Sequence, residues 1–152
     1  MKSYEQTIRE LQLKGYEKDK ASLIAFNKVK SNLENTKQRI YNRIYEIQKE
    51  KGYFITLTYR NKEKNINRSH RHLITWCRNN CDLYIGNIDF GDQNQRLHHH
   101  VACVPNNNLL YKSWKYGAIN IQKIRDSKKD GRKAVMYITK LVNHAIKETA
   151  NY

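Results

Sequence analysis

The hydrophobic pattern of the chain changes its period at Gly52, and this change sets the class of fold. Before Gly52, apolar residues recur every three or four positions, as they do in amphipathic helices. Ser3 and Gln6 have the spacing of a capping box and predict a short first helix. Residues 20–50 predict a second helical region, of one or two helices. Residues 53–59 form instead a β-branched and aromatic run, which predicts a buried strand.

After this first strand, the predicted elements follow in the order α-β-β-β-α. The helices are expected at residues 67–80 and 133–147, and the strands at 82–90, 96–104 and 117–124. A polar turn joins the first two of these strands into a hairpin. The order predicts an α+β fold, with helices packed on a central, mainly antiparallel sheet of four to five strands. We expect a helical N-terminal appendage of residues 1–51 and a main domain of residues 52–152.

The net charge of +15 results from 29 Lys and Arg against 14 Asp and Glu. Such an excess repels itself unless an anionic partner neutralises it, and nucleic acid is a partner of this kind. The excess is +11 in residues 51–152 and +4 in residues 1–50, so we expect the later region to face the polyanion. A solvated basic surface without a specific ligand is the alternative that charge alone leaves open.

Cys77, Cys81 and Cys103 are an odd number of cysteines in a chain whose first residues are charged and helix-like. This composition predicts reduced thiols and a location in the cytosol of a bacterial or other host cell. No segment approaches the roughly 20 apolar residues that a membrane-spanning helix needs. A membrane function is therefore not expected.

The run of three histidines from His98 to His100 lies in a predicted strand. Because side chains alternate along a strand, His98 and His100 share one face, about 7 Å apart at the backbone. Asp89 ends the preceding strand, and a hairpin register that pairs Asn87 or Asp89 with His98 would add this carboxylate as a third metal ligand. Two imidazoles and a carboxylate suit Mn²⁺ or Mg²⁺, and zinc is not excluded. The alternative is a histidine run without a metal, and His99 is expected to be neutral and at least half-buried.

Tyr137 lies on the flank of the last predicted helix, in one row with Lys140 and His144. A tyrosine in this place is more often a packing residue at the edge of a core. A phenol has a pKa near about 10, so its attack on a phosphodiester needs positive charge nearby. Lys140 and a metal ion would supply this charge, which favours Tyr137 as a nucleophile.

Three motifs stand in a fixed order along the chain: residues 54–58 (Phe-Ile-Thr-Leu-Thr), 97–100 (Leu-His-His-His) and 137–140 (Tyr-Ile-Thr-Lys). In this order they resemble the motifs of the HUH endonucleases, specifically the rolling-circle replication initiator (Rep) proteins of plasmids and phages, over about residues 52–147. The stretch from Ser113 to Gly117 is also similar to phage and plasmid members.

This resemblance implies a ferredoxin-like or RRM-like fold for the main domain, which would be a metal-dependent nuclease. It further implies that origin DNA, single-stranded or in a hairpin, is nicked through a covalent 5′-phosphotyrosine at Tyr137 and later closed. Lys140 would position the phosphate or assist the tyrosine, and the free 3′-hydroxyl would serve a polymerase, with a helicase encoded separately. The chain departs from the family in its polar His99 and in the single tyrosine of the last motif.

We expect DNA to contact basic and aromatic side chains of the main domain. These candidates are Arg60, Arg96, Lys112, Trp114, Lys115, Tyr116, Lys133 and His144.

Three other functions compete with a nicking enzyme that initiates replication. The first is a basic DNA-binding or repressor module without catalysis. The second is a transposase or conjugative relaxase with the same chemistry. The third is a structural zinc site made by Cys77, Cys81, His98 and His100, since a Cys-x-x-x-Cys pair followed by histidines is able to bind zinc.

Overall fold

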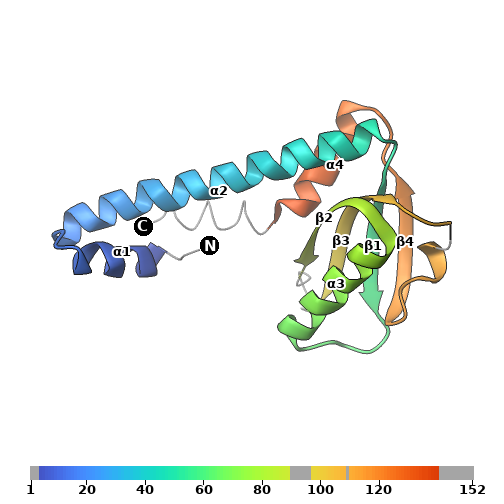
Figure 1. Cartoon of the computed structure of the whole chain (residues 1–152), viewed down its shortest axis with the longest axis horizontal. Coiled ribbons are helices and arrows are strands. Elements are labelled where there is room, and N and C mark those ends of the chain that lie inside the picture. The colour runs from blue at the N-terminus through green and yellow to red at the C-terminus, as the bar shows by residue number, and fades with distance from the viewer. Residues whose placement is uncertain (1–3, 90–96, 109, 141–152) are drawn as a thin grey trace. The chain divides into compact units, whose positions relative to one another are not determined.

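The computed structural model describes residues 4–89, 97–108 and 110–140 of the chain (Figure 1). The elements follow in the order α1 (Tyr4–Leu13), α2 (Lys18–Lys49), β1 (Tyr53–Tyr59), α3 (Ile66–Asn80), β2 (Cys81–Asp89), β3 (His98–Pro105), η1 (Leu110–Lys112), β4 (Gly117–Lys123) and α4 (Lys128–Ile138). The chain divides into two compact units, and the sheet lies in the unit that runs from Ile40 to Lys140. The predicted α+β class is confirmed.

The described strands form one antiparallel sheet in the order β2-β3-β1-β4. β3 therefore lies between β1 and β2, and α3 connects these two strands. The hairpin register pairs Asp89 with His98 and Asn87 with His100, while β1 places Thr56 opposite His100 on the other side. The predicted strands match the observed ones to within two residues, and the register that brings Asp89 beside the histidines is confirmed.

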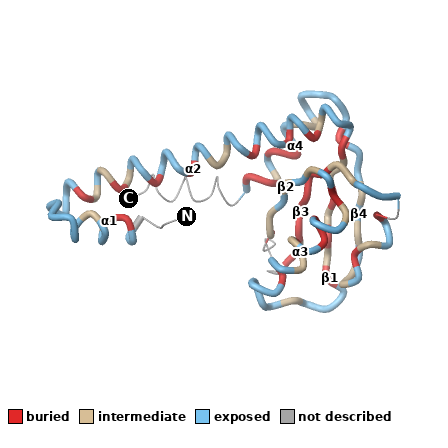
Figure 2. Tube along the Cα trace, in the orientation of Figure 1, coloured by how far each residue is buried: buried red, intermediate tan, exposed pale blue. Residues whose placement is uncertain are grey.

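The two faces of this sheet are covered by different helices. α3 packs on the face to which the odd-numbered residues of β1 and β3 point, and this side holds the main apolar core. Its members include Ile55, Leu57, Leu73, Trp76, Val101 and Cys103. Figure 2 shows the buried residues concentrated in β1 and β3, the two central strands. α4 lies on the opposite face, where its Tyr137 contacts Phe54 and His100.

His99 is a fully buried histidine within the apolar core, with 0% of its surface exposed. Its Nε2 atom lies 3.0 Å from both the Tyr59 hydroxyl and the Ser69 hydroxyl, which are 2.8 Å apart. Burial lowers the pKa of His99 to about 4, so the ring is neutral at pH 7. The expectation of a neutral, buried His99 is confirmed, because two hydroxyl groups of neighbouring elements satisfy one of its ring nitrogens.

The last helix begins earlier than predicted, at Lys128 instead of residue 133. The Ser127 side chain accepts a hydrogen bond from the backbone N–H of Asp130. The Asp130 carboxylate in turn accepts from the backbone N–H of Arg125 at 2.9 Å. This Ser-x-x-Asp capping pattern is present in the sequence, but the following Gly131 has the appearance of a turn signal.

α4 ends at Ile138, where the prediction continued to residue 147. The Thr139 hydroxyl donates to the carbonyl oxygen of Val135 at 2.6 Å, a contact that competes with regular helix bonding. Residues 141–147 of the predicted helix lie outside the described part of the chain.

The other compact unit contains α1 and the first part of α2. The turn between these helices uses Gly15, which has a φ of +96° that favours glycine. α2 is a single helix of 32 residues, which settles the choice between one and two helices. Ser3, the predicted cap of α1, lies outside the described residues. No helix in the described ranges combines the length and the apolar character that crossing a membrane requires.

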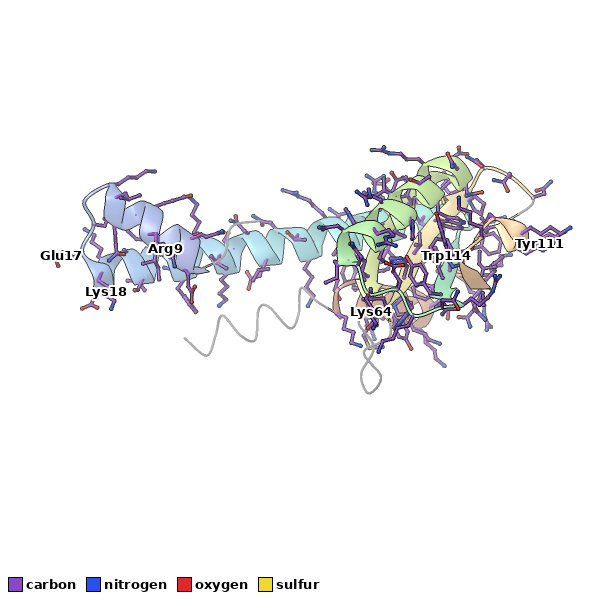
Figure 3. The ribbon with its side chains drawn as sticks, turned by 90° about the horizontal axis from the view of Figure 1, so that it is seen from below. Arg9, Glu17, Lys18, Lys64, Tyr111 and Trp114 are labelled. Carbon is purple, nitrogen blue, oxygen red and sulfur yellow. The ribbon has the colours of Figure 1, made fainter. Side chains whose placement is uncertain are left out.

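Tyr59→Phe should lower the free energy of unfolding by about 1–2 kcal/mol, because it removes a hydroxyl from the buried group around His99. Chemical denaturation measures this change. Tyr111→Phe is the control, since Tyr111 is 58% exposed on η1 and projects at the edge of this unit (Figure 3). It should stay within about 0.5 kcal/mol of the wild type. Equal effects of the two substitutions would contradict a stabilising role of the buried hydroxyl.

Candidate functional site

The candidate site lies on the sheet face that α4 covers in part. The alternation of β3 directs His98 and His100 to this face, and their ring centroids are 4.8 Å apart. β2 adds Asp89, which stands opposite His98 in the hairpin. One ligand atom from each of the three side chains lies within 4.8 Å of the other two. The three side chains predicted as metal ligands therefore form one cluster.

Positively charged and imidazole groups surround the Asp89 carboxylate, which is only 6% exposed. Its Oδ2 atom lies 3.5 Å from His98 Nε2 and 3.8 Å from His100 Nδ1. Lys140 Nζ donates to both carboxylate oxygens at 3.3 Å. Burying a carboxylate costs free energy unless a positive group or hydrogen bonds compensate it. Lys140 provides this compensation and thereby lies beside the ligand cluster.

The donor atoms of this cluster fit a divalent cation. Burial lowers the pKa of His100 to about 4, and the neighbouring His98 contributes in the same direction, so His100 is a neutral imidazole at pH 7. Its Nδ1 atom is buried and has no hydrogen-bond partner. A buried polar atom in this state calls for an explanation, and a ligand that uses its lone pair provides one. The Asp89, His98 and His100 cluster could thus hold a metal ion.

Tyr137 is the penultimate residue of α4 and lies against this cluster. The centroid of its ring is 5.0 Å from that of His100 and 5.6 Å from that of Phe54. Its side chain is half-buried, between the sheet and the solvent. The structure therefore brings the predicted nucleophile and the predicted metal ligands to one face of the sheet.

A hollow of about 580 Å³ opens beside Tyr137, between α4 and the strands β1 and β4. Thr56 and His100 line it from the sheet, and Tyr137 lines it from the helix. Its other lining residues are Phe54, Gln122, Lys123, Ile124, Arg125, Asp130, Lys133 and Ala134. Three of these side chains are basic and one is acidic, so the hollow favours an anionic ligand.

The predicted DNA contacts are distributed over different parts of the unit. Lys133 is exposed and lines the hollow beside Tyr137. Arg60, Lys112 and Lys115 are exposed in the segments that follow β1 and precede β4. Tyr116 is half-buried and stacks on His72 at a centroid distance of 3.8 Å. Two further candidates, residues 96 and 144, lie outside the described residues.

Trp114 takes a place that does not suit a DNA contact. Only 5% of its surface is exposed, and its indole N–H donates to the carbonyl oxygen of Thr58 at 2.9 Å. In Figure 3 it lies inside the sheet-containing unit. Its ring packs against Tyr59 and Tyr116, so Trp114 is a core residue and cannot stack on a base. The expectation of base stacking by Trp114 is therefore corrected.

Several residues of the site were absent from the sequence prediction. Lys123 and Arg125 line the hollow, although neither was among the expected DNA contacts. Asn87 donates through Nδ2 to the carbonyl oxygens of Tyr137 and Ile138. The two-residue period of β2 places Asn87 on the same face as Asp89, and this signal was available in the sequence.

The alternative zinc site of two cysteines and two histidines does not form. Cys77 and Cys81 belong to the buried core on the α3 side of the sheet, whereas His98 and His100 point to the α4 side. Both cysteines, and Cys103 with them, are free and buried. Within the described ranges, Asp89, His98 and His100 are the group of metal-ligating side chains close enough to share an ion.

Comparison with known proteins identifies a family. Residues 52–144 match the sequence model of a family of replication-associated proteins, described under the name "Replication-associated protein ORF2". Among solved structures, the chain is similar to the crystal structure of the hypothetical protein ORF119 from Sulfolobus islandicus rod-shaped virus 1. The sequence identity is 17%, the TM-score is 0.46, and the alignment covers 68% of this chain and 90% of that one. A search of curated proteins found no match.

Asp89→Asn should weaken the binding of Mn²⁺ by at least about tenfold, because it removes the charged ligand of the cluster. Isothermal titration calorimetry of the metal-free protein measures this affinity. Asp126→Asn removes an exposed carboxylate before α4 and is the control, with an expected affinity equal to that of the wild type. An Asp89→Asn variant that binds Mn²⁺ as tightly as the wild type would rule out this cluster as the metal site.

Proposed function

The chain belongs to the ORF2 family of replication-associated proteins, and on this premise we propose that it initiates rolling-circle replication by nicking and rejoining single-stranded DNA through Tyr137. One observation carries the proposal: the ring of Tyr137 lies 5.0 Å from that of His100, within the cluster that also contains Asp89 and His98. A nucleophile and a set of metal ligands at this separation are able to act on the same phosphate.

In the proposed reaction, the Tyr137 hydroxyl oxygen attacks the phosphorus of a phosphodiester and its proton passes to solvent. A bond forms between the tyrosine oxygen and phosphorus, and the bond from phosphorus to the 3′ oxygen breaks. The 3′ oxygen takes up a proton and leaves as a free hydroxyl, while the 5′-phosphate remains on Tyr137. Attack of a 3′-hydroxyl on this phosphotyrosine reverses the step, rejoins the strand and releases the tyrosine.

Charge is what this reaction requires of the site, because a phenol ionises only at a pH near about 10. A divalent ion bound by Asp89, His98 and His100, which we propose to be Mn²⁺ or Mg²⁺, would polarise the phosphate and offset the charge that develops on it. The ammonium group of Lys140 lies at the same cluster, 3.3 Å from Asp89. From there Lys140 would hold the phosphate near Tyr137 and favour the phenolate form.

The proposed substrate is origin DNA that is single-stranded or exposed in a hairpin. The hollow beside Tyr137 would receive the strand, with Lys123, Arg125 and Lys133 pairing with phosphates. Arg60, Lys112, Lys115 and Tyr116 precede or follow the ends of β1 and β4, where they would contact the same strand further along. Thr56 and Gln122 offer hydrogen-bonding groups between these basic regions.

The chemistry that we propose is that of the HUH endonucleases, which the three ordered sequence motifs resemble. The division into a helical appendage of residues 1–51 and a nuclease domain of residues 52–152 remains part of this proposal. A polymerase would extend the free 3′-hydroxyl, and a separate helicase would unwind the duplex.

Tyr137→Phe should abolish a covalent protein–DNA adduct, because phenylalanine has the same shape and no nucleophilic oxygen. Labelled single-stranded origin oligonucleotides, incubated with Mn²⁺ and separated by denaturing electrophoresis, reveal the adduct. Binding of the same oligonucleotides should remain nearly unchanged. Tyr45→Phe removes the hydroxyl of an exposed tyrosine on α2 and should leave the adduct intact.

A wild-type protein that binds the oligonucleotides and forms no adduct with Mn²⁺ or Mg²⁺ would refute the nicking reaction. That result would favour the DNA-binding module without catalysis.

Lys133→Ala should weaken the binding of single-stranded DNA by a similar factor for all sequences, since a phosphate contact carries no sequence information. The slope of log K against log salt concentration should become less steep by about 0.7, the value for one phosphate contact on a single strand. Fluorescence anisotropy at several salt concentrations measures both quantities. Lys128→Ala, on the opposite side of α4 from the hollow, should leave the slope unchanged. An unchanged slope in Lys133→Ala would exclude this lysine from the DNA path.

A further inference from the structure

Side-chain amides attach α4 to the rest of the unit at both of its ends. Near the N-terminal end, Gln48 Nε2 donates to the carbonyl oxygens of Arg125 and Ser127, each at 2.8 Å. At the C-terminal end, Asn87 Nδ2 donates to the carbonyl oxygens of Tyr137 at 2.9 Å and Ile138 at 3.2 Å. The last carbonyl groups of a helix have no partner within the helix, so Asn87 supplies donors that this end lacks.

Asn87 occupies a particular place in the sheet. It stands directly opposite His100 in the β2–β3 hairpin, and it precedes Asp89 by two residues on the same face of β2. A single side chain therefore joins the backbone of Tyr137 to the strand pair that carries the three metal ligands. Because strands are rigid elements, this link determines where the end of α4 lies relative to those ligands.

The demands of packing alone do not explain this asparagine. Its side-chain oxygen, Oδ1, is buried and has no hydrogen-bond partner. An unsatisfied polar atom of this kind lowers the stability of a fold, and native proteins contain few of them. The two bonds from Nδ2 to the end of α4 are the interactions that compensate for this cost.

We propose that Asn87 is a positioning residue that holds the Tyr137 side chain over the Asp89, His98 and His100 cluster. This inference rests on the proposed nicking function, for which Tyr137 must approach a phosphate bound at that cluster. Covalent attack requires the reacting atoms to be about 3–3.5 Å apart and aligned, and a displacement of about 1 Å costs on the order of 10²-fold in rate. Loss of the link should therefore slow the attack without removing any group that reacts or binds DNA.

The test compares Asn87→Leu with Gln48→Met, because each replaces an amide by an apolar side chain of similar size. Each variant loses two hydrogen bonds to the backbone at one end of α4. With saturating single-stranded oligonucleotide and Mn²⁺, adduct formation should slow by on the order of 10²-fold in Asn87→Leu. The affinities for DNA and for Mn²⁺ should stay at the wild-type values. Gln48→Met, which acts at the far end of the helix, should form the adduct at the wild-type rate.

Asn87→Gln keeps the amide donor on a longer side chain and should recover part of the rate. It also keeps the inference testable if Asn87→Leu does not fold, because its rate should then fall between those of the wild type and Tyr137→Phe. A wild-type rate in Asn87→Leu, or an equal loss of rate in Gln48→Met, would overturn the positioning role.

A second measurement does not depend on metal or activity. In the metal-free wild type, nuclear Overhauser effects should connect the ring protons of Tyr137 with those of His100 and Phe54. These effects should weaken in Asn87→Leu and persist in Gln48→Met. If they persist in Asn87→Leu, Asn87 does not position the tyrosine. If they respond as expected while the wild type forms no adduct, the positioning stands and the nicking function fails.

Discussion

The register of β3 between its two neighbours is the constraint on which the site depends. A shift of β3 by one residue would turn His98 and His100 into the apolar core and direct His99 toward the solvent. The hydrogen bonds of His99 with Tyr59 and Ser69 favour the observed register, because only His99 meets hydroxyl groups on the core side. The histidine that departs from the family pattern thus helps to place the two that form the cluster.

Electrostatic balance decides how this face is built. Asp89 is buried, and its charge is compensated by Lys140 and by the two imidazoles beside it. The adjoining hollow carries an excess of positive charge from lysine and arginine side chains. An acidic centre inside a basic surface suits a site that binds both a cation and a phosphate, because each ligand meets the opposite charge.

The attachment of α4 links this electrostatic centre to the tyrosine. Gln48 and Asn87 come from two different elements, α2 and β2, and each reaches the backbone at one end of α4. A nucleophile on a helix that is held in this way is better ordered than one on a loop, and order of this kind reduces the entropy lost in reaching the transition state. The sheet and the helix therefore act together in the proposed reaction.

The sequence by itself determined the α+β class, the strands of the sheet and the grouping of Asp89 with His98 and His100. These features follow from local patterns: a period of two along each strand, and a short hairpin that limits the possible registers. Only the tertiary structure decided that Trp114 is buried, that Asn87 holds the end of α4, and that Tyr137 meets His100. Each of these contacts joins residues at least 37 positions apart in the chain, and their formation depends on how the helices pack, which no local pattern specifies.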